Sequence, residues 1–404
     1  MENALCLSYV KGKRIMDMNL YMQFHEPVNR VNTECIKWDN RAAFGNAQAL
    51  PMWVADMDFK TADGIIDALV KRAQHGVFGY AQENPRDKQA VVNWMKNRHN
   101  THVEPEWVLY SPGVVDSIYH VLNANFDKSA RVVIQPPVYG PFSGMTNKAG
   151  MTLIENRLIE RETGWEMDLN GLEEIFKAGA EAMILCSPHN PIGRVWKREE
   201  LESVVKLCSQ YGVLLIADEI HADFELRGAT HHSILSIPGG ENAVVFISAT
   251  KTFNLAAIRH STILCANEEL RKKITDSLSA SMAEVNLFGR LATRAAYETG
   301  WDWLDALNEY LSDSRDILMQ GIEKIDGIRA HAPEGTYLMW LDCRELGMTD
   351  DELKDFFIQK CGIIPTNGAF FGTGGEGHMR LNFATTHKNI LTAIERIEKA
   401  VRER

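Results

Sequence analysis

The chain has 404 residues, 45% of them hydrophobic and 24% charged, and a formal net charge of −11 at pH 7. A chain of this length is too long to fold around a single compact core, so we expect two domains. The acidic balance argues against nucleic acid as the main ligand, because phosphate-backbone binding requires an excess of Lys and Arg. No run of about eighteen apolar residues predicts a membrane span.

The cysteines are odd in number and scattered along the chain. They stand at positions 6, 35, 186, 208, 265, 343 and 361. None forms a close pair of the zinc or redox type, so we predict no metal site and a reducing, cytoplasmic setting. The first thirty residues contain no signal-peptide core and are expected to form an N-terminal arm.

Residues 51–59 place Asp56 and Asp58 among apolar and aromatic side chains. Alone, this segment favours a polar turn packed by its neighbours. Helical spacing of apolar residues follows over 62–75, and Gly76 and Gly79 end that pattern before Tyr80. A second helical pattern covers residues 86–99.

A Ser-Pro-Gly turn at residues 111–113 precedes a helix whose apolar face includes Val115 and Ile118. The first N–H groups of a helix are unpaired and lie at the positive end of its dipole, so Gly113 and Val114 suit a phosphate. Such turns also simply begin helices. A strand at 131–135 follows, and Tyr139 lies just beyond its carboxyl end.

Strands and helices then alternate. Strands are predicted at 151–155, 182–186, 213–217 and 244–247, helices at 168–178 and 199–211, and an antiparallel edge strand at 262–265. This alternation predicts an α/β fold with a mostly parallel sheet and helices on both faces. Ligands bind beyond the carboxyl ends of such strands, where Tyr139, Asn190, Asp218 and Lys251 follow their strands.

After residue 300 the pattern changes to a smaller α/β unit. Helices are predicted at 302–325, at 350–361 and at the C-terminus, with strands at 337–341 and 379–383. We therefore divide the chain into 1–60 (arm and part of a small domain), 61–300 (large domain) and 301–404 (small domain). Arg380 lies inside an apolar strand and is either a snorkelling edge residue or a clamp for a carboxylate.

Lys251 comes directly after the buried strand 244–247, next to the hydroxyl residues Ser248 and Thr250. It either begins a solvated loop or is held in the interior. A desolvated lysine has a lowered pKa and can form an imine with an aldehyde. Arg259, eight residues later, has a guanidinium suited to a phosphate.

These residue types match the needs of pyridoxal-phosphate chemistry. Asp218 would keep the ring nitrogen protonated, Asn190 would donate to the phenolate oxygen, and Tyr139 would cover the ring. Gly113, Val114, Ser248 and Arg259 would hold the phosphate. Arg380 would bind the carboxylate of an amino-acid substrate.

Over nearly its whole length the chain resembles fold type I pyridoxal-phosphate enzymes, and more narrowly the cystathionine β-lyase and C–S lyase branch. The motifs that carry this resemblance are Trp53-Val54-Ala55-Asp56-Met57-Asp58-Phe59, Cys186-Ser187-Pro188-His189-Asn190-Pro191, Gly193-Arg194-Val195-Trp196, Asp218-Glu219-Ile220-His221, Lys251-Thr252-Phe253-Asn254 and Met379-Arg380-Leu381-Asn382.

The resemblance implies a large cofactor domain, a small domain built from both chain ends, and a homodimer in which Tyr80 reaches the neighbouring subunit's phosphate. Two differences from related enzymes matter, one from members of the branch and one from classical aminotransferases. Gly140 stands where some members carry a second tyrosine, and His221 stands where aminotransferases carry a tyrosine. Arg259 fits the wider fold type I pattern, although several members of the branch lack it.

The expected site follows from these assignments. Lys251 is the catalytic residue; cofactor binding falls to Tyr80, Gly113, Val114, Val115, Tyr139, Asn190, Asp218, His221, Ser248, Lys251 and Arg259, and substrate binding to Ala55, Asn190 and Arg380.

The leading functional hypothesis is β-elimination from cystathionine, cysteine or a cysteine S-conjugate, which yields a thiol, pyruvate and ammonia. An aminotransferase would use the same residues, because only the fate of the α-carbanion differs. A regulatory binding protein that keeps the fold is the alternative of another class.

Overall fold

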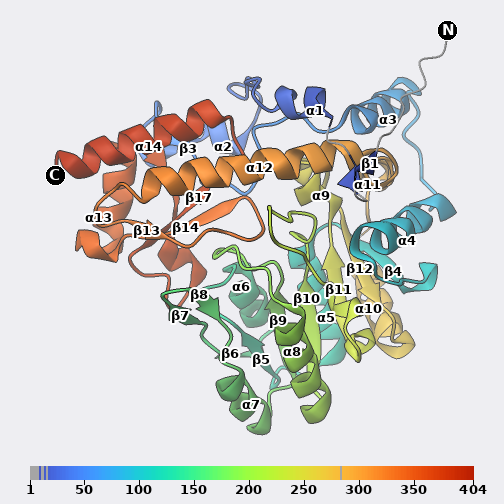
Figure 1. Ribbon diagram of the computed structural model, residues 1–404. Helices are drawn as coiled ribbons and strands as arrows, with labels where there is room; N and C mark the ends of the chain where they lie inside the picture. The colour runs from blue at the N-terminus through green and yellow to red at the C-terminus, as the bar shows by residue number, and fades with distance from the viewer. Residues whose placement is uncertain (1–8, 11–12, 15–16, 283) are drawn as a thin grey trace.

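The computed structural model describes residues 9–10, 13–14, 17–282 and 284–404 (Figure 1). Much of the expected N-terminal arm, namely residues 1–8, 11–12 and 15–16, lies outside the described residues. Helix α1 (Met18–Gln23) is capped by the Asp17 side chain and contacts α12 (Trp301–Ile322). Phe24, directly after α1, is buried against the rest of the chain.

A seven-stranded sheet forms the centre of the molecule, in the order β4-β12-β11-β10-β9-β5-β6. Its strands are β4 (Val108–Ser111), β5 (Arg131–Ile134), β6 (Thr152–Glu155), β9 (Ala182–Cys186), β10 (Leu214–Asp218), β11 (Val244–Ile247) and β12 (Ser261–Cys265). All are parallel except β12, which runs antiparallel to both of its neighbours. The predicted α/β class with a mostly parallel sheet is confirmed.

The predicted place of the antiparallel strand at the sheet edge is wrong. Strand β12 lies between β11 and β4, because β4 pairs with its outer side through Ser111 and Ser261. The short run 108–111 carries no alternation that distinguishes it from a loop, so its pairing with a strand about 150 residues later left no local signal.

Helices cover both faces of this sheet, and alternate strand residues face different helices. Val132, Ile184 and Phe246 belong to one apolar cluster, with residues of α5 (Val114–Asn125), α6 (Pro141–Lys148) and α10 (Glu268–Ala280). Their neighbours Val133, Leu185 and Val245 belong to the other, with α7 (Leu169–Lys177) and α8 (Arg198–Tyr211). Burial on both faces explains why the strands read as continuous apolar runs.

A four-stranded sheet, in the order β13-β14-β17-β16, is formed by the C-terminal part of the chain. Its strands are β13 (Arg329–Ala330), β14 (Leu338–Asp342), β16 (Thr366–Asn367) and β17 (His378–Asn382). Helix α12 and the last helix, α14 (His387–Arg402), run side by side across this part (Figure 1). Strand β3 (Leu50–Pro51) pairs with β15 (Ile363–Ile364), so the start of the chain joins its end.

The remaining elements are shorter or carry weaker sequence signals. They are β1 (Tyr9–Val10), β2 (Lys13–Arg14), α2 (Ile36–Asp39), α3 (Asp63–Gln74), α4 (Pro85–His99), the hairpin β7 (Ile159–Arg161) and β8 (Gly164–Glu166), α9 (Ala249–Thr252), α11 (Leu287–Thr299) and α13 (Asp350–Asp355), which continues as a π-helix over Phe356–Lys360. Sequence patterns did not predict α6, α10 or α11; in α10 only Ile274 and Leu278 are buried. None of the helices in the described part of the chain has the length and apolar character of a membrane span.

Candidate active site

Neighbouring strands bring their polar ends to one edge of the seven-stranded sheet. Strands β5, β9, β10 and β11 are adjacent and parallel, so the residues after them lie at a common edge. Asp218 ends β10, Asn190 follows β9, Tyr139 follows β5, and Lys251 follows β11. The convergence predicted for these four residues is therefore present in the fold.

Lys251 lies in the single turn of α9, which begins where β11 ends. Its Nζ donates a hydrogen bond to the carbonyl oxygen of Ala55 over 2.8 Å. Burial, followed by the positive charge of Arg380, lowers the pKa of Lys251 to about 8. A substantial fraction of this amine is thus neutral, and able to act as a base or nucleophile, near physiological pH.

Asp218 is a buried carboxylate, 3% exposed, at the end of β10. Its Oδ1 accepts a hydrogen bond from the backbone N–H of Ile220 at 3.2 Å, and no side-chain cation forms an ion pair with it in the described part of the chain. Burial raises the pKa of Asp218 to about 7. Such a carboxylate fits a ligand that brings its own cationic N–H group.

Arg380 is a buried cation, 4% exposed, in the middle of β17. Its Nη1 donates to Asn190 Oδ1 at 2.9 Å, and its Nη2 donates to Trp53 O at 2.8 Å and to Thr366 Oγ1 at 3.1 Å. No carboxylate pairs with it among the described residues, and burial lowers the pKa of Arg380 to about 10. A buried, positioned guanidinium without a counter-ion fits an anionic ligand such as an α-carboxylate.

Asn190 and His221 have unused hydrogen-bonding capacity at the same edge. The Asn190 carbonyl oxygen accepts from Arg380, and its NH₂ group donates to nothing in the described structure. His221 is 3% exposed, its Nδ1 has no partner within the described residues, and burial holds the pKa of His221 well below its usual range. Both groups are therefore available to a polar ligand.

Tyr139 forms an aromatic wall beside Asp218. Its ring packs edge-on against Phe142 and Phe370, with centroids 5.8 and 6.5 Å away. Burial and the nearby Asp218 charge raise the pKa of Tyr139, so its hydroxyl stays protonated. A Cβ atom at Gly140 would lie 2.5 Å from the carbonyl oxygen of Phe370. Phe370 therefore supplies the second aromatic contact here, and the structure explains why glycine stands at position 140.

The Ser-Pro-Gly turn begins α5 at the same sheet edge. In the register of β12, Ser111 pairs with Ser261 and Ile247 pairs with Thr262, which places the ends of β4 and β11 together. The backbone N–H groups of Gly113, Val114 and Val115 make no hydrogen bond to any described residue. This helix start is free to bind an anion.

Ser248 and Arg259, the other two residues expected to bind a phosphate, already make contacts within the chain. The Ser248 hydroxyl donates to His260 O at 2.7 Å and caps α9 by accepting from Thr250 N. Arg259 is exposed, and its Nη2 lies 3.2 Å from the Oδ2 atom of Asp116 in the first turn of α5. Arg259 thus lies next to the free helix start, whereas the Ser248 hydroxyl is already engaged.

Ala55 lies in the loop 53–59, which several distant residues hold in place. Its carbonyl oxygen accepts from Lys251 and from the hydroxyl of Tyr337, each at 2.8 Å. Asn382 Nδ2 donates to Val54 O and to Asp56 O, both at 2.6 Å. Sequence reasoning did not assign Tyr337 or Thr366, because their contacts join segments about 300 residues apart.

Three side chains from the segment 30–38 stabilise this loop through its carboxylates. Asp58 is 5% exposed and accepts from Lys37 Nζ at 3.1 Å, Arg30 Nη1 at 2.8 Å and Trp38 Nε1 at 2.9 Å. Arg30 also pairs with Asp56 at 2.7 Å. The interpretation of Asp56 and Asp58 as a polar turn packed by its neighbours agrees with these contacts.

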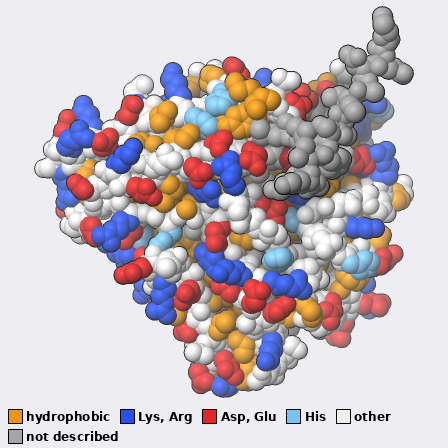
Figure 2. Space-filling view, in the orientation of Figure 1, with side chains coloured by type: hydrophobic (Ala, Val, Ile, Leu, Met, Phe, Trp, Pro, Cys, Tyr) orange, Lys and Arg blue, Asp and Glu red, His pale blue; other side chains and the backbone are white. Residues whose placement is uncertain are grey.

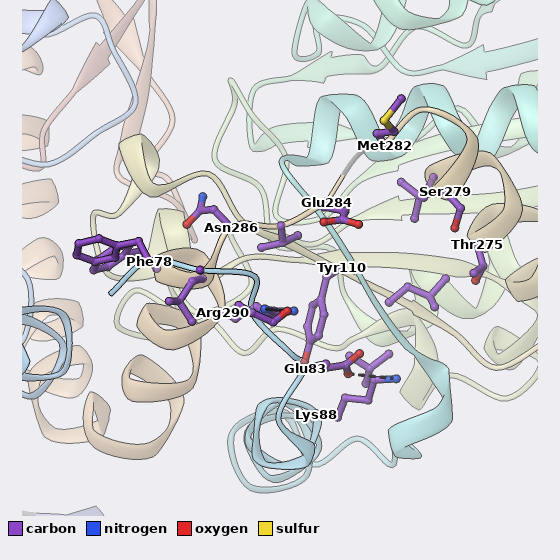
Figure 3. Close-up of a pocket in the computed structure, with 18 residues that line it drawn as sticks. Phe78, Glu83, Lys88, Tyr110, Thr275, Ser279, Met282, Glu284, Asn286 and Arg290 are labelled. Carbon is purple, nitrogen blue, oxygen red and sulfur yellow. Dashed lines mark hydrogen bonds and ion pairs between the residues drawn. The ribbon is translucent and has the colours of Figure 1, made fainter. Parts of the chain in front are cut away.

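Tyr80 does not join these residues within one chain. It is fully exposed in the segment that links α3 to α4, next to the exposed Val77 and Phe78. This segment lines an adjacent cavity of about 690 Å³ together with α10, α11 and Tyr110. Figure 3 shows the side chains that line it. Val77, Phe78 and Tyr80 thus expose apolar or aromatic side chains next to one another on this segment.

The chain is similar to known proteins over most of its length. A model of the aminotransferase class I and II family matches residues 53–397. The chain is 36% identical to cystathionine beta-lyase PatB of Bacillus subtilis, across 94% of this chain and 100% of PatB. It is 31% identical to protein MalY of Escherichia coli, across 94% of this chain and 98% of MalY. The crystal structure of cystalysin from Treponema denticola, which contains pyridoxal 5′-phosphate, matches with a TM-score of 0.91 and 30% identity, covering 96% of this chain and 99% of cystalysin.

Proposed function

The chain belongs to the aminotransferase class I and II family, and from this premise we propose that it is a pyridoxal-phosphate-dependent carbon–sulfur lyase. Relatives that match nearly all of the chain include one named cystathionine beta-lyase. The resemblance to the cystathionine β-lyase branch of fold type I enzymes is thereby confirmed. The observation that carries the proposal is the meeting of an amine of low pKa, Lys251, with an unpaired buried carboxylate, Asp218, at one sheet edge.

The residues of this edge fit pyridoxal phosphate. Asp218 would pair with the ring N–H, the free NH₂ group of Asn190 would donate to the ring hydroxyl oxygen, and Tyr139 would cover one ring face. When bound, the cofactor supplies an electron-poor ring that draws electron density from the α-carbon of an amino acid.

The other end of the cofactor would bind at the start of α5. The free N–H groups of Gly113, Val114 and Val115 suit its phosphate, and Arg259 lies beside them. Ser248 would position α9 rather than donate to the phosphate, because its hydroxyl already donates to His260 O. His221 would contribute a neutral imidazole, and Lys251 would hold the aldehyde carbon covalently.

Arg380 and Lys251 would perform the substrate chemistry. Arg380 would bind the α-carboxylate. The substrate's amine would replace Lys251 at the aldehyde carbon, and the freed amine of Lys251 would then remove the proton from the α-carbon. The electron pair of the broken C–H bond expels the β-thiolate as the Cβ–S bond breaks, and hydrolysis of the remaining fragment yields pyruvate and ammonia. Ala55 would orient the amine through its carbonyl oxygen. The proposed substrates are cystathionine, cysteine and cysteine S-conjugates.

An assay without a keto-acid acceptor tests this function. The purified holoenzyme is mixed with cystathionine, and pyruvate and free thiol are measured in parallel. The proposal predicts that both products form in equal amounts. Turnover that depends on added keto acid would instead identify an aminotransferase and reject the lyase.

We also propose that the enzyme is a cytoplasmic homodimer in which Tyr80 completes the partner's phosphate site. The exposed Val77, Phe78 and Tyr80 support this assembly. Six cysteines among the described residues are free thiols, which agrees with a reducing compartment. Acidic and basic side chains are interspersed over the face seen in Figure 2, which gives no reason to expect nucleic acid there.

The proposed domain division is 1–60 and 301–404 around the four-stranded sheet, with 61–300 forming the cofactor domain. The pairing of β3 with β15 supports a small domain built from both chain ends.

A further inference from the structure

A second polar cluster lies outside the candidate active site. The hairpin β7–β8 lies beside the four-stranded sheet (Figure 1), and a cleft of about 820 Å³ opens between them. Glu160 comes from β7, Asp342 ends β14, and His378 begins β17. Asp342 and His378 are paired residues in the antiparallel register of β14 and β17. One potential ligand atom from each of the three residues lies within 4.8 Å of the other two.

His378 gives the clearest indication of a ligand at this cluster. Its side chain is 2% exposed, and its ring stacks on Trp340 at a centroid distance of 5.0 Å. Its Nδ1 lies 2.8 Å from the carbonyl oxygen of Glu376, so Nδ1 carries the proton and donates it. Its Nε2 then presents a buried lone pair with no hydrogen-bond partner in the described structure, 4.0 Å from Asp342 Oδ1.

We propose that Glu160, Asp342 and His378 form a binding site for a divalent transition-metal cation of the Zn²⁺ type. Metal-binding histidines commonly donate their second ring N–H to a backbone carbonyl, as His378 does to Glu376. A metal ion with one imidazole and two carboxylate ligands is of the zinc type, whereas Mg²⁺ and Ca²⁺ prefer oxygen ligands alone. Ligands at about 2 Å from one ion lie roughly 3–4 Å apart, so side-chain movements of about 1 Å would complete the site.

Arg344 is the internal competitor for this cation. Its Nη2 lies 2.8 Å from Glu160 Oε1 and 2.7 Å from Asp342 Oδ2, and its Nε lies 2.8 Å from Asp342 Oδ1. Arg344 forms no hydrogen bond with the Nε2 atom of His378. The Arg344 side chain is 49% exposed, so it can turn into solvent when a cation neutralises the two carboxylates. Metal binding therefore replaces one guanidinium charge by a dication that also satisfies the imidazole.

The cation would connect two parts of the fold that Arg344 and the edge-on contact between the rings of Trp165 and His378 already join. Glu160 belongs to the hairpin after β6, and His378 lies two residues before Arg380 on the same strand. Alternate residues of a strand share a face, so the ion would fix β17 close to the proposed carboxylate clamp. The cysteine spacing predicted no metal site, and these ligands leave no motif because they are about 180 and 36 residues apart in the chain.

Zn²⁺ binding to the purified holoenzyme tests the proposal, with bound metal measured after equilibrium dialysis. We expect one equivalent of Zn²⁺, and affinity at least tenfold weaker in Glu160→Gln and in His378→Asn. Glu162→Gln is the matched control, because Glu162 lines the same cleft outside the cluster and its removal should leave affinity unchanged. Arg344→Gln should bind Zn²⁺ more tightly.

The Glu160 side chain is 28% exposed, so Glu160→Gln is expected to fold even if the buried His378→Asn variant does not, and circular dichroism checks the fold of both variants. Unchanged binding in a folded Glu160→Gln or His378→Asn variant would overturn the proposal, as would weaker binding in Arg344→Gln. Because the measurement is binding rather than turnover, its result is independent of the proposed lyase function.

Discussion

The Nζ atom of Lys251 and the carbonyl oxygen of Ala55 lie 2.8 Å apart, which fastens the end of β11 to a loop near the start of the chain. Tyr337 donates to the same oxygen, and Asn254 donates to Met57 O in the same loop at 2.8 Å. The reactive amine is therefore positioned by backbone that distant side chains hold in place. Its orientation and its low pKa have separate causes, namely these hydrogen bonds and its burial.

Lys251 should react with acylating reagents at lower pH than other lysines. The pKa of about 8 means that the amine is mostly protonated at pH 6.5 and mostly neutral at pH 9. In cofactor-free protein, labelling of Lys251 by acetic anhydride should rise about tenfold between pH 6.5 and 8 and level off above pH 9, as measured by peptide mass spectrometry. Exposed lysines in the same samples should continue to rise towards pH 10. Parallel profiles for Lys251 and the exposed lysines would contradict the assignment.

Replacing Asp218 by Asn should stabilise the cofactor-free protein while abolishing activity. The folded state raises the pKa of this carboxyl from 3.8 to about 7, so it binds the proton more tightly than the unfolded state. Stability is therefore lost as pH rises from about 4 to 7, by roughly 4 kcal/mol at most. Asp218→Asn should thus be more stable than the parent at pH 8 and equal to it near pH 4, in urea unfolding.

The same variant should lose β-elimination, because the ring nitrogen would lose its anionic partner. Asp116→Asn, which changes an exposed carboxylate near the phosphate site, is the control for a general effect of removing one charge. A stability difference between Asp218→Asn and the parent that does not grow between pH 4 and 7 would contradict the raised pKa of Asp218.

Arg380→Lys should impair recognition of the substrate carboxylate. Lysine keeps the charge but loses the planar fork, and a charge-assisted hydrogen bond contributes about 1.5–3 kcal/mol, so kcat/KM should fall about tenfold to a hundredfold. The methyl ester of the same amino acid serves as the control substrate, because it lacks the anion. Equal losses on acid and ester would show that Arg380 acts on the structure of the site rather than on the carboxylate.

The strand-end residues were predictable for a simple reason. Parallel strands share one carboxyl edge, so Asn190, Asp218 and Lys251 meet once the alternation of strands and helices is recognised. The hydrogen-bond partners of Arg380 could not be predicted from the sequence. Trp53 and Thr366 come near Arg380 only because the two ends of the chain pair with each other in the fold. Backbone acceptors such as Ala55 O carry no side-chain signal at all.

Mixing two inactive variants tests whether the site is shared between subunits. In Tyr80→Ala the proposed partner contact to the phosphate is missing, and in Lys251→Ala the amine is missing. A mixed dimer would hold one site with Lys251 from the first variant and Tyr80 from the second. Activity should therefore return to as much as a quarter of the parent value after subunit exchange. Recovery should be absent when Tyr80→Ala is mixed with itself, and failure of the mixture to recover despite proven exchange would reject the shared site.

Replacing Gly140 by alanine, which adds only a methyl group, should destabilise the protein. The Gly140 backbone is in the right-handed helical region, so alanine fits the conformation, but the new Cβ would lie 2.5 Å from Phe370 O. That carbonyl belongs to the 3₁₀ turn Gly368–Phe371, whose Phe371 O accepts from Val138 N at 2.9 Å, so the turn cannot retreat without breaking this contact. We expect Gly140→Ala to lose about 1–3 kcal/mol of unfolding free energy.

Gly144 provides the matched control for this substitution within α6. A Cβ there meets nothing within 4 Å, so Gly144→Ala should be neutral or gain up to about 1 kcal/mol from its helix propensity. Urea unfolding of both variants without cofactor isolates the steric effect from ligand binding. Equal stability of the two variants would show that the turn carrying Phe370 O moves aside at little cost, and would contradict the predicted steric effect.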